Sequence, residues 1–234
     1  GATTYYVGGN DQGTNWVAGT WANLDSALGS ALAAGDEVRV SGAYARSPGE
    51  TVLAVTSSGT AANPIRVTGG WDAEFTTQAW VGTALPHQTS TLTGYTVLDA
   101  AASNGNESRV FDINGSYVKV EGFKMTGGYT DVDGDGSGGG VQITATNSTL
   151  SHAWVTDNRR HDNYANGDGG GVGVLADNVT LEYVTVTNNR CTGTSSDGGG
   201  VANVTGGIFV ANSYFSGNSA AGTGDALYIE GNTT

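Results

Sequence analysis

The stretch Gly169-Gly170-Gly171-Val172-Gly173-Val174 decides the fold, because the chain repeats it. A glycine triplet followed by valine also occurs at 138–141 and 198–201, and a weaker copy spans 224–227, so the motif recurs at nearly even intervals. Short stretches with alternating apolar residues follow at 141–143, 172–174 and 227–229, and 110–113 resembles the copy before them. This alternation predicts a strand in each repeat.

A second strand is expected in each repeat, over segments of equal length at 120–128, 150–158, 181–189 and 210–218. Aligned, these segments place apolar residues in their first and sixth columns, and Asn158, Asn189 and Asn218 in their last. Such columns arise when each repeat makes one turn, or rung, of a solenoid and stacks about 4.8 Å above the rung before it. Stacked asparagines suit the bends, where their amides bond to one another. The sequence therefore predicts an all-β fold, a right-handed parallel β-helix.

The N-terminal part is less regular. Residues 5–7 read as a strand, 21–34 as a capping helix stopped by Gly35, and 36–44 as the first rung. We expect a single domain over 1–234. It comprises an N-terminal strand and capping helix (1–37), irregular rungs (38–109) and regular rungs of about 30 residues (110–234), the last of them incomplete.

Composition limits the possible partners. The chain has 9 basic and 22 acidic residues, a net charge of −13, which argues against nucleic acid as a partner. No apolar stretch of about 20 residues is present, so we expect no membrane insertion. The opening Gly1-Ala2-Thr3-Thr4 suits a processed, secreted protein, and we expect a secreted or cell-surface location.

Two motifs carry a resemblance to known families. Phe215-Ser216-Gly217-Asn218, with the triplet-and-valine motif at 199–201, resembles the repeat of the chlamydial polymorphic outer membrane proteins. More broadly, the chain looks like the pectin-lyase-like superfamily of right-handed β-helices. That resemblance implies the fold and leaves function open, because such helices serve as lyases, adhesins, toxin passengers and structural fibres.

One acidic segment is a candidate calcium site. Asp131, Asp133 and Asp135, followed by Gly136, match the first half of a calcium-binding loop, in which carboxylates at alternate positions converge on a hard cation. The twelfth position, where such loops carry glutamate, is Gln142. The segment is either a Ca²⁺ site, the one cofactor we consider, or an acidic solvated turn.

Binding is expected in the variable segments 129–137, 159–168, 190–197 and 219–223, which emerge on one side of a solenoid. The candidates there are Arg159, Arg160, His161, Asp162 and Asp168. Polysaccharide lyases of this fold use a base, often Lys or Arg, near an acidic calcium site, so the segment could be catalytic. The alternative is that Arg159 and Arg160 pair with carboxylates on adjacent rungs. The sequence shows no pair of residues that could act as nucleophile and base, so we assign no catalytic residue.

Four tryptophans gather in the N-terminal third, at Trp16, Trp21, Trp71 and Trp80. They either form a face on which sugar rings stack, or pack the cap and its flanking loops against the tube.

Two functions follow. The first is a non-catalytic structural or adhesive protein that stacks end to end into a filament. Its assembly edges would be Tyr5, Tyr6 and Val7 at one end and Leu227, Tyr228 and Ile229 at the other, joined by β-augmentation. The alternative is a carbohydrate-active protein, lyase-like or glycan-binding, with a groove lined by segments 129–137 and 159–168. The expected partner is thus another copy of the chain, or a glycan or cell surface.

Overall fold

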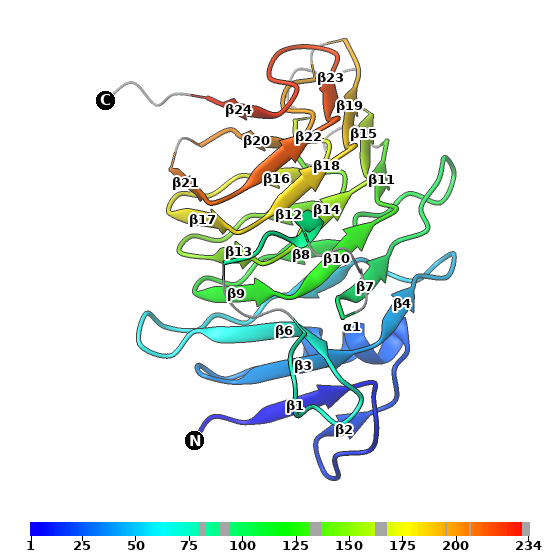
Figure 1. Cartoon of the computed structure of the whole chain (residues 1–234), viewed down its shortest axis with the longest axis vertical. Coiled ribbons are helices and arrows are strands. Elements are labelled where there is room, and N and C mark those ends of the chain that lie inside the picture. Colours follow the sequence, from blue (N-terminus) through cyan, green and yellow to red (C-terminus); the bar gives the residue numbers. More distant parts are fainter. Residues whose placement is uncertain are drawn as a thin grey trace.

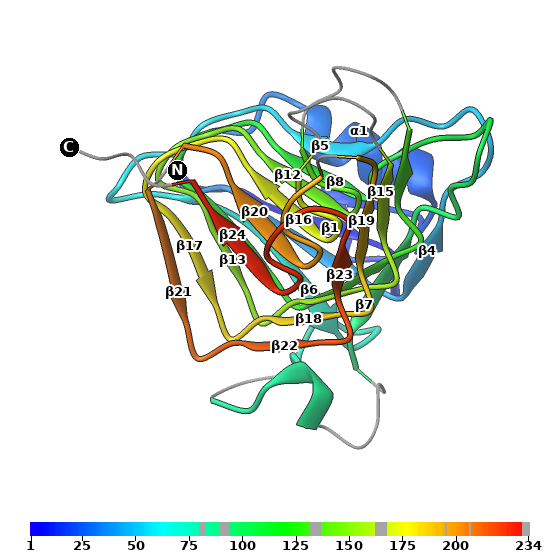
Figure 2. The ribbon, with the colours of Figure 1, turned by 90° about the horizontal axis from the view of Figure 1, so that it is seen from above.

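The computed structural model describes residues 1–79, 83–88, 94–131, 137–161, 168–194, 196–205 and 207–230. They form a parallel β-solenoid of about seven turns, with the N-terminus at one end and the last turn at the other (Figure 1). Seen from the C-terminal end, the chain runs counterclockwise as it rises towards the viewer, so the solenoid is right-handed (Figure 2). No helix in the described ranges is long and apolar enough to cross a membrane.

Four stacks of parallel strands make the walls, named here in the order in which each rung visits them. The first sheet contains β5 (Leu53–Val55), β8 (Phe111–Ile113), β12 (Val141–Ile143), β16 (Val172–Val174), β20 (Val201–Asn203) and β24 (Leu227–Ile229). The second contains β2 (Trp16–Val17), β1 (Thr4–Val7), β3 (Glu37–Ser41), β6 (Ile65–Trp71), β9 (Val118–Glu121), β13 (Thr149–Ser151), β17 (Val179–Glu182) and β21 (Ile208–Ala211).

The third sheet contains β4 (Ala43–Ala45), β7 (Thr96–Asp99), β10 (Phe123–Thr126), β14 (Trp154–Thr156), β18 (Thr185–Thr187) and β22 (Tyr214–Ser216). The fourth contains β11 (Tyr129–Thr130), β15 (Arg159–His161), β19 (Arg190–Thr192) and β23 (Ser219–Ala220). The short helix η1 (Pro86–Gln88) lies outside the tube (Figure 2). There the His87 ring stacks on Tyr214 of the third sheet, with 3.9 Å between ring centroids.

The core is a set of apolar ladders, as the sequence columns predicted. Val120 pairs in register with Leu150, and Leu150 with Leu181, while Met125, Val155 and Val186 do the same on the third sheet. All six are fully buried. The ladders also reach the irregular rungs, because Leu53 of β5 pairs with Phe111 across a long excursion of the chain. Apolar burial along these ladders is the main stabilising contribution.

The second segments of the repeats are not single strands, and that prediction was wrong. Each divides into a strand of the second sheet and a strand of the third, with a bend between them at Gly122, His152, Tyr183 or Asn212. All four bend residues have left-handed φ, between 44° and 88°. A left-handed residue turns the chain sharply, so each rung gains a corner that the columns did not reveal.

The predicted asparagine ladder is present, with Asn158 and Asn189 buried and Asn218 half-buried. Asn158 Nδ2 donates to Asn189 Oδ1, and Asn189 Nδ2 donates to Asn218 Oδ1, both at 3.0 Å. The left-handed residue of this bend is the one before each ladder asparagine, for example Asn188 with φ 56°. The ladder thus holds the corner between the third and fourth sheets by side-chain hydrogen bonds.

The glycine triplets are tied to this ladder. The first glycine has a left-handed φ, 84° at Gly169, which an L-residue rarely adopts. A Cβ on Gly170 would lie 2.4 Å from the carbonyl oxygen of Gly199 on the next rung. A Cβ on Gly171 would lie 2.9 Å from Asn189 Cγ. The triplet is therefore the surface against which the next rung and the asparagine of its own rung pack.

The N-terminal helix is shorter than predicted. Helix α1 spans Trp21–Gly29, with Thr20 as its N-cap, and does not continue to Ala34. Ser30 has an extended backbone and its hydroxyl donates to Ala27 O at 2.7 Å, which closes the last turn. The Asp36 carboxylate then accepts from the backbone N–H of Ala33, at 2.8 Å, and holds this stretch in a non-helical path.

Strand β1 forms where predicted but is not an edge. It pairs with β3 on one side and with β2 on the other, where Tyr6 and Val7 face Trp16 and Val17. The expectation that Tyr5, Tyr6 and Val7 offer a free strand for assembly is therefore wrong, because β2 already occupies much of that side. Within the described residues the outermost strand here is β2.

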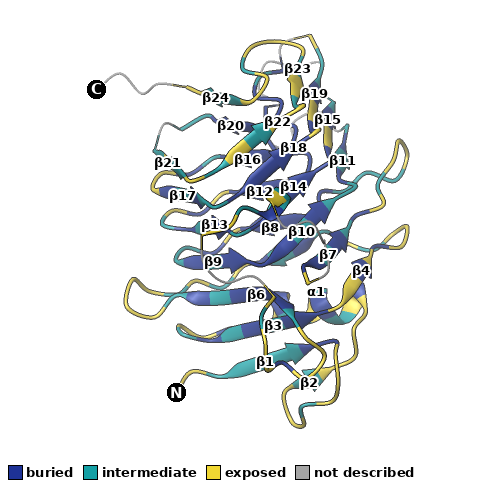
Figure 3. Cartoon of the chain, in the orientation of Figure 1, coloured by how far each residue is buried: buried dark blue, intermediate teal, exposed yellow. Residues whose placement is uncertain are grey.

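The last described turn is open, in contrast. Strands β21 to β24 are the outermost of their four sheets. Of the large hydrophobic side chains that are exposed in the described ranges, Phe209, Tyr214 and Ile229 belong to this turn and Val17 to β2. Figure 3 shows this turn in teal and yellow above the buried rungs.

Candidate functional site

The outer face of the fourth sheet carries the predicted basic residues. Residues 159–161 form β15 rather than a loop, so successive side chains point to opposite sides of the wall. Arg159 faces outward and is exposed, whereas Arg160 faces the interior and is fully buried. Arg159 lies in register with Arg190 of β19, and Arg160 with the buried Cys191. The sequence grouped Arg159 with Arg160, but the structure pairs it with Arg190.

The two outward guanidinium groups are not neutralised by carboxylates of the described residues. Arg159 Nε donates to Thr192 Oγ1 at 3.3 Å, and its guanidinium lies 5.3 Å from the centroid of the Tyr129 ring. The Arg190 side chain makes no ion pair or hydrogen bond within the part of the chain that the structure describes. Within the described residues Arg159 pairs with no carboxylate, and the alternative that Arg159 and Arg160 pair with carboxylates on adjacent rungs stays a prediction.

A polar cluster lies beside Arg159 on the same face. The Tyr129 hydroxyl donates to Asp131 Oδ2 at 3.1 Å, and Asp131 Oδ1 is 3.8 Å from His161 Nε2. His161 Nδ1 is 3.0 Å from Thr192 Oγ1, and that hydroxyl contacts the Arg160 carbonyl oxygen at 3.3 Å. If the hydroxyl donates to this carbonyl, it accepts from His161 Nδ1, which leaves Nε2 as the nitrogen that can take up a proton.

The pKa of Tyr129 is raised, first by partial burial and then by the nearby Asp131 carboxylate, which accepts its proton in a hydrogen bond. The positive charge of Arg159 opposes this shift. At neutral pH the Tyr129 phenol therefore keeps its proton and can donate it. Asp131 lies between this donor and His161, so it orients the phenol directly and attracts the imidazole once Nε2 carries a proton.

A groove of about 430 Å³ runs beside the arginine pair at the corner between the third and fourth sheets. It is lined by Asp157, Asn158, Arg159, Asn188, Arg190 and Gly217. The Arg159 and Arg190 guanidinium groups therefore border a concave surface with one carboxylate, Asp157, and two amides. The predicted groove was lined by segments 129–137 and 159–168, whereas this one lies at the bends that precede β15 and β19.

The remaining candidates lie elsewhere. Asp168 is buried, and its Oδ1 accepts from the Asp197 backbone N–H at 2.9 Å. Burial raises the pKa of Asp168 and the Asp197 charge adds to this, while the charge of Arg160 lowers it. Arg160 and Asp168 are thus interior groups and not surface ligands. Asp162 lies outside the described residues.

The calcium motif is mostly beyond what the structure describes. Asp131 is placed on the fourth sheet, as above, whereas Asp133 and Asp135 lie outside the described residues. Over the ranges described, no three His, Cys, Asp or Glu side chains are grouped so that they could hold a metal ion. The Ca²⁺ site stays a prediction.

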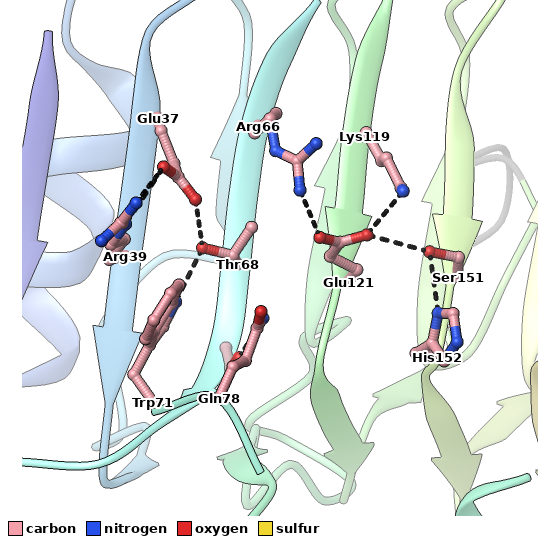
Figure 4. A network of polar contacts seen from close by, with 11 residues as sticks. Glu37, Arg39, Arg66, Thr68, Trp71, Gln78, Lys119, Glu121, Ser151 and His152 are labelled. Atoms are coloured by element: carbon pink, nitrogen blue, oxygen red, sulfur yellow. Dashed lines mark hydrogen bonds and ion pairs between the residues drawn. The ribbon is translucent and has the colours of Figure 1, made fainter. Parts of the chain in front are cut away.

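A second polar cluster, which the sequence did not suggest, covers the outer face of the second sheet (Figure 4). Its centre is Glu121, whose carboxylate meets Arg66 at 2.6 Å, Lys119 at 2.7 Å and the Ser151 hydroxyl at 3.3 Å. Glu37 meets Arg39 in the same way at 3.0 Å. The rung register could have revealed this cluster, because Arg66 pairs with Lys119 and Thr68 with Glu121.

The two clusters differ in what they offer a ligand. In the second-sheet cluster, Glu37 and Glu121 are each engaged by a neighbouring cation, so these charges compensate one another. On the fourth sheet Arg159 and Arg190 keep their positive charge facing solvent. An anionic ligand therefore finds its complement on the fourth sheet.

The described tryptophans do not form a common sugar-stacking face. Trp21 is buried and its indole N–H donates to Thr51 O at 2.9 Å. The Trp71 N–H donates to Thr68 Oγ1 on the second sheet, and Trp16 lies on β2 at the N-terminal end. Trp80 lies outside the described residues. Packing explains Trp21, and Trp16 borders a pocket of its own.

Comparison with known proteins identifies the fold. No protein-family model matches the chain, and no curated protein matches its sequence. Among solved structures, it is similar to pectate lyase Pel9A (TM-score 0.57, 16% identity), covering 90% of this chain and 47% of that one. It is also similar to an alginate lyase from Paenibacillus sp. strain FPU-7 (TM-score 0.53, 15% identity), covering 91% and 66%. The chain thus spans about half to two thirds of these lyases and shares their parallel β-helix.

Proposed function

We propose that the chain is a carbohydrate-active protein that binds an acidic polysaccharide along the outer face of the fourth sheet. The observation that carries this is the pair Arg159 and Arg190, exposed side by side on adjacent rungs beside a groove, in a chain of net charge −13. In-register residues on adjacent rungs are about 4.8 Å apart, so the pair can clasp one carboxylate or neighbouring ones. The fold similarity to a pectate lyase and an alginate lyase supports uronate polymers as the ligand class.

We further propose a lyase-like activity at this face, with each group in a defined role. Arg159 and Arg190 bind the uronate carboxylate and stabilise the negative charge that develops when the α-proton leaves. His161 Nε2 takes that proton, and Asp131 stabilises the imidazolium that results. The Tyr129 hydroxyl turns from Asp131 to donate its proton to the departing glycosidic oxygen, and the proton on His161 then returns to the phenolate through Asp131. The C–O bond breaks as a C=C bond forms, so the product is an unsaturated sugar. No step is routed through calcium, which, if bound near Asp131, would supply additional charge for the carboxylate.

Binding and cleavage are tested separately. The double variant Arg159→Ala/Arg190→Ala should lose binding to polygalacturonate and alginate about tenfold or more, because charged hydrogen bonds contribute about 1.5 kcal/mol or more each. Lys124→Ala is the matched control, since Lys124 is a cation of the third sheet outside the groove. Undiminished binding in the double variant would contradict the proposal.

Cleavage is followed by the ultraviolet absorbance of the unsaturated product. His161→Ala and Tyr129→Phe should each lower the rate by about a hundredfold or more while leaving binding within about twofold. If wild-type protein binds the polysaccharide but forms no product, with or without added Ca²⁺, the lyase activity is refuted and the chain is a glycan-binding module. Absence of both would remove the proposal.

Acidic polysaccharides of this kind are extracellular polymers, so we propose a location outside the cell or on its surface. The resemblance of 215–218 to the chlamydial repeat rests on its motif alone and agrees with that location without adding a function. Immunodetection of the protein in the culture medium and on intact cells tests this part of the proposal.

End-to-end assembly is a second candidate, favoured by the exposed Phe209, Tyr214 and Ile229 of the last described turn. Leu227, Tyr228 and Ile229 form an outermost strand there, as predicted, and an outermost strand can pair with another chain. We propose that the pairing surface at the other end is β2 rather than β1. Filaments in electron micrographs would support this, and particles that stay monodisperse at every concentration would contradict it.

A further inference from the structure

The N-terminal end of the solenoid contains a pocket that neither cluster uses. It has a volume of about 290 Å³ and lies between helix α1 and strands β1 and β2. Tyr5 and Val7 line it from β1, Trp16 and Val17 from β2, and Ser26 from α1. The pocket lies at the opposite end of the molecule from β19 and β23 (Figure 1). It is therefore separate from the arginine groove.

Three aromatic residues border this pocket, and the strand register puts Trp16 beside Tyr6 on the face opposite Tyr5 and Val7. The Trp16 indole N–H donates to Gly8 O at 2.7 Å, which fixes the ring against the strand. Tyr6, which also borders the pocket, packs edge-on against Phe75 with 5.1 Å between ring centroids. Trp16 and Tyr6 thus stabilise the strands that carry the pocket, while the Tyr5 ring, on the α1 side with Val7 and Val17, offers a flat apolar surface to a ligand.

The rim offers neutral hydrogen-bonding groups. Thr14, Asn15 and Ser26 are exposed at the pocket, and no protein hydrogen bond to their side chains exists within the described residues. The Tyr5 phenol is likewise without such a bond there. Water satisfies these groups when the pocket is free, so ligand hydroxyls can replace that water without stranding a protein group.

Among the residues that the structure describes, no charged side chain lines the pocket. This separates it from the groove beside Arg159 and Arg190, where a uronate would bind. A ligand with an apolar face, several hydroxyls and no charge is a neutral sugar ring. The volume is near the lower end for ligand pockets, which suits one ring rather than several.

We infer that this pocket binds a neutral sugar residue, either free or as the end of an oligosaccharide. The inference does not depend on the arginine groove, because the two sites share no residue and differ in charge. A protein carrying both would hold a glycan that has acidic and neutral parts, or two glycans at once. The pocket is then a binding site without a chemical step.

The test is calorimetric titration of the whole protein with glucose, galactose, mannose and their neutral disaccharides. A single ring should bind with a dissociation constant of about 1 mM. Asn15→Ala should weaken binding severalfold, and Ser26→Trp, which fills the pocket without removing a packed group, should abolish it. Arg190→Ala should leave it unchanged, whereas the same variant should lose acidic polysaccharide. If Arg190→Ala lost the neutral sugar and Ser26→Trp kept it, the sugar would bind in the arginine groove, and the inference would be wrong.

The inference is overturned if no neutral sugar binds the folded wild-type protein at about 10 mM sugar, which is ten times the expected dissociation constant. It is also overturned if Ser26→Trp binds as well as wild type, since the sugar would then lie elsewhere. Light scattering on wild type and Ser26→Trp tests whether a second copy of the chain occupies the pocket instead. If wild type self-associates and Ser26→Trp stays monomeric with no sugar effect, the pocket is a contact between copies, and the inference is wrong.

Discussion

Replacing Asn189 by alanine should destabilise the solenoid more than replacing Asn218, the next asparagine of the ladder. Asn189 is fully buried and its side chain makes four hydrogen bonds, each 3.0 Å long. Its Oδ1 accepts from the backbone N–H and the Nδ2 of Asn158. Its Nδ2 donates to Val155 O and to Asn218 Oδ1. Alanine removes all four and leaves a gap beside Gly171, which packs on Asn189.

The cost follows from which partners are stranded. The Asn158 backbone N–H loses its acceptor and stays buried, which costs about 1–3 kcal/mol. Asn158 Nδ2 keeps bonds to Met125 O and Thr156 O, and Asn218 Oδ1 keeps one from the Asn189 backbone N–H, so these losses are smaller. Together with the small cavity, we expect a loss of about 3–5 kcal/mol in the free energy of unfolding.

Asn218→Ala is the internal comparison. Asn218 makes the same kind of bonds but lies on the last described turn, where it is only half-buried. Water can replace the lost partners there, so we expect a loss of about 1–2 kcal/mol. Urea unfolding followed by circular dichroism measures both, and hydrogen exchange at the Asn158 amide reports the stranded group directly. A loss below about 1 kcal/mol for Asn189→Ala, or equal losses for both variants, would refute the reasoning.

Three more predictions concern charge and close packing. Asp168→Asn should be more stable than wild type at pH 7, because burial raises the pKa of Asp168 in the folded state and its ionisation then costs stability. The gap should close as the pH falls towards about 4, which urea midpoints at several pH values will show, and a gap independent of pH would contradict this. Glu121→Gln should cost about 1 kcal/mol at low salt and less at high salt, measured in the same way, because partly exposed ion pairs are screened. Gly170→Ala should lower the melting temperature strongly, because its Cβ would meet backbone atoms of two neighbouring segments at 2.4 Å. Gly29→Ala, which meets nothing within 4 Å, should leave the melting temperature equal or higher, and equal effects of the two glycines would count against the packing argument.

The sequence predicted the ladders because each column repeats one residue class, as in Val120, Leu150 and Leu181. It did not predict the corner between the second and third sheets, because His152, Tyr183 and Asn212 share a backbone conformation and no chemical feature. The strand pairing of the early, irregular rungs was not predicted either, because the chain between Leu53 and its partner Phe111 is longer than one regular rung.

The sequence analysis identified Arg159 of the candidate site but not Arg190. Arg159 and Arg160 are adjacent in sequence, so they read as one basic cluster, but a strand sends neighbours to opposite faces. Arg190 is the true neighbour of Arg159, since it occupies the equivalent position of the next repeat, one rung away. Applying the repeat spacing to the charged residues as well as to the apolar ones would have found it. The second-sheet cluster around Glu121 needed the same step.

The contact between each glycine triplet and its asparagine divides every rung into a constant part and a variable part. The interval in sequence from the last glycine of a triplet to the asparagine that packs on it is identical in the three rungs that begin at Gly140, Gly171 and Gly200. The path from that asparagine to the next glycine run has no fixed length, since it is longer from Asn158 to Gly169 than from Asn189 to Gly198. Insertions and substitutions can therefore accumulate after the asparagine without shifting the ladder. The fourth-sheet side is thus the part of the molecule where new specificity can evolve, or be grafted, at little risk to the fold.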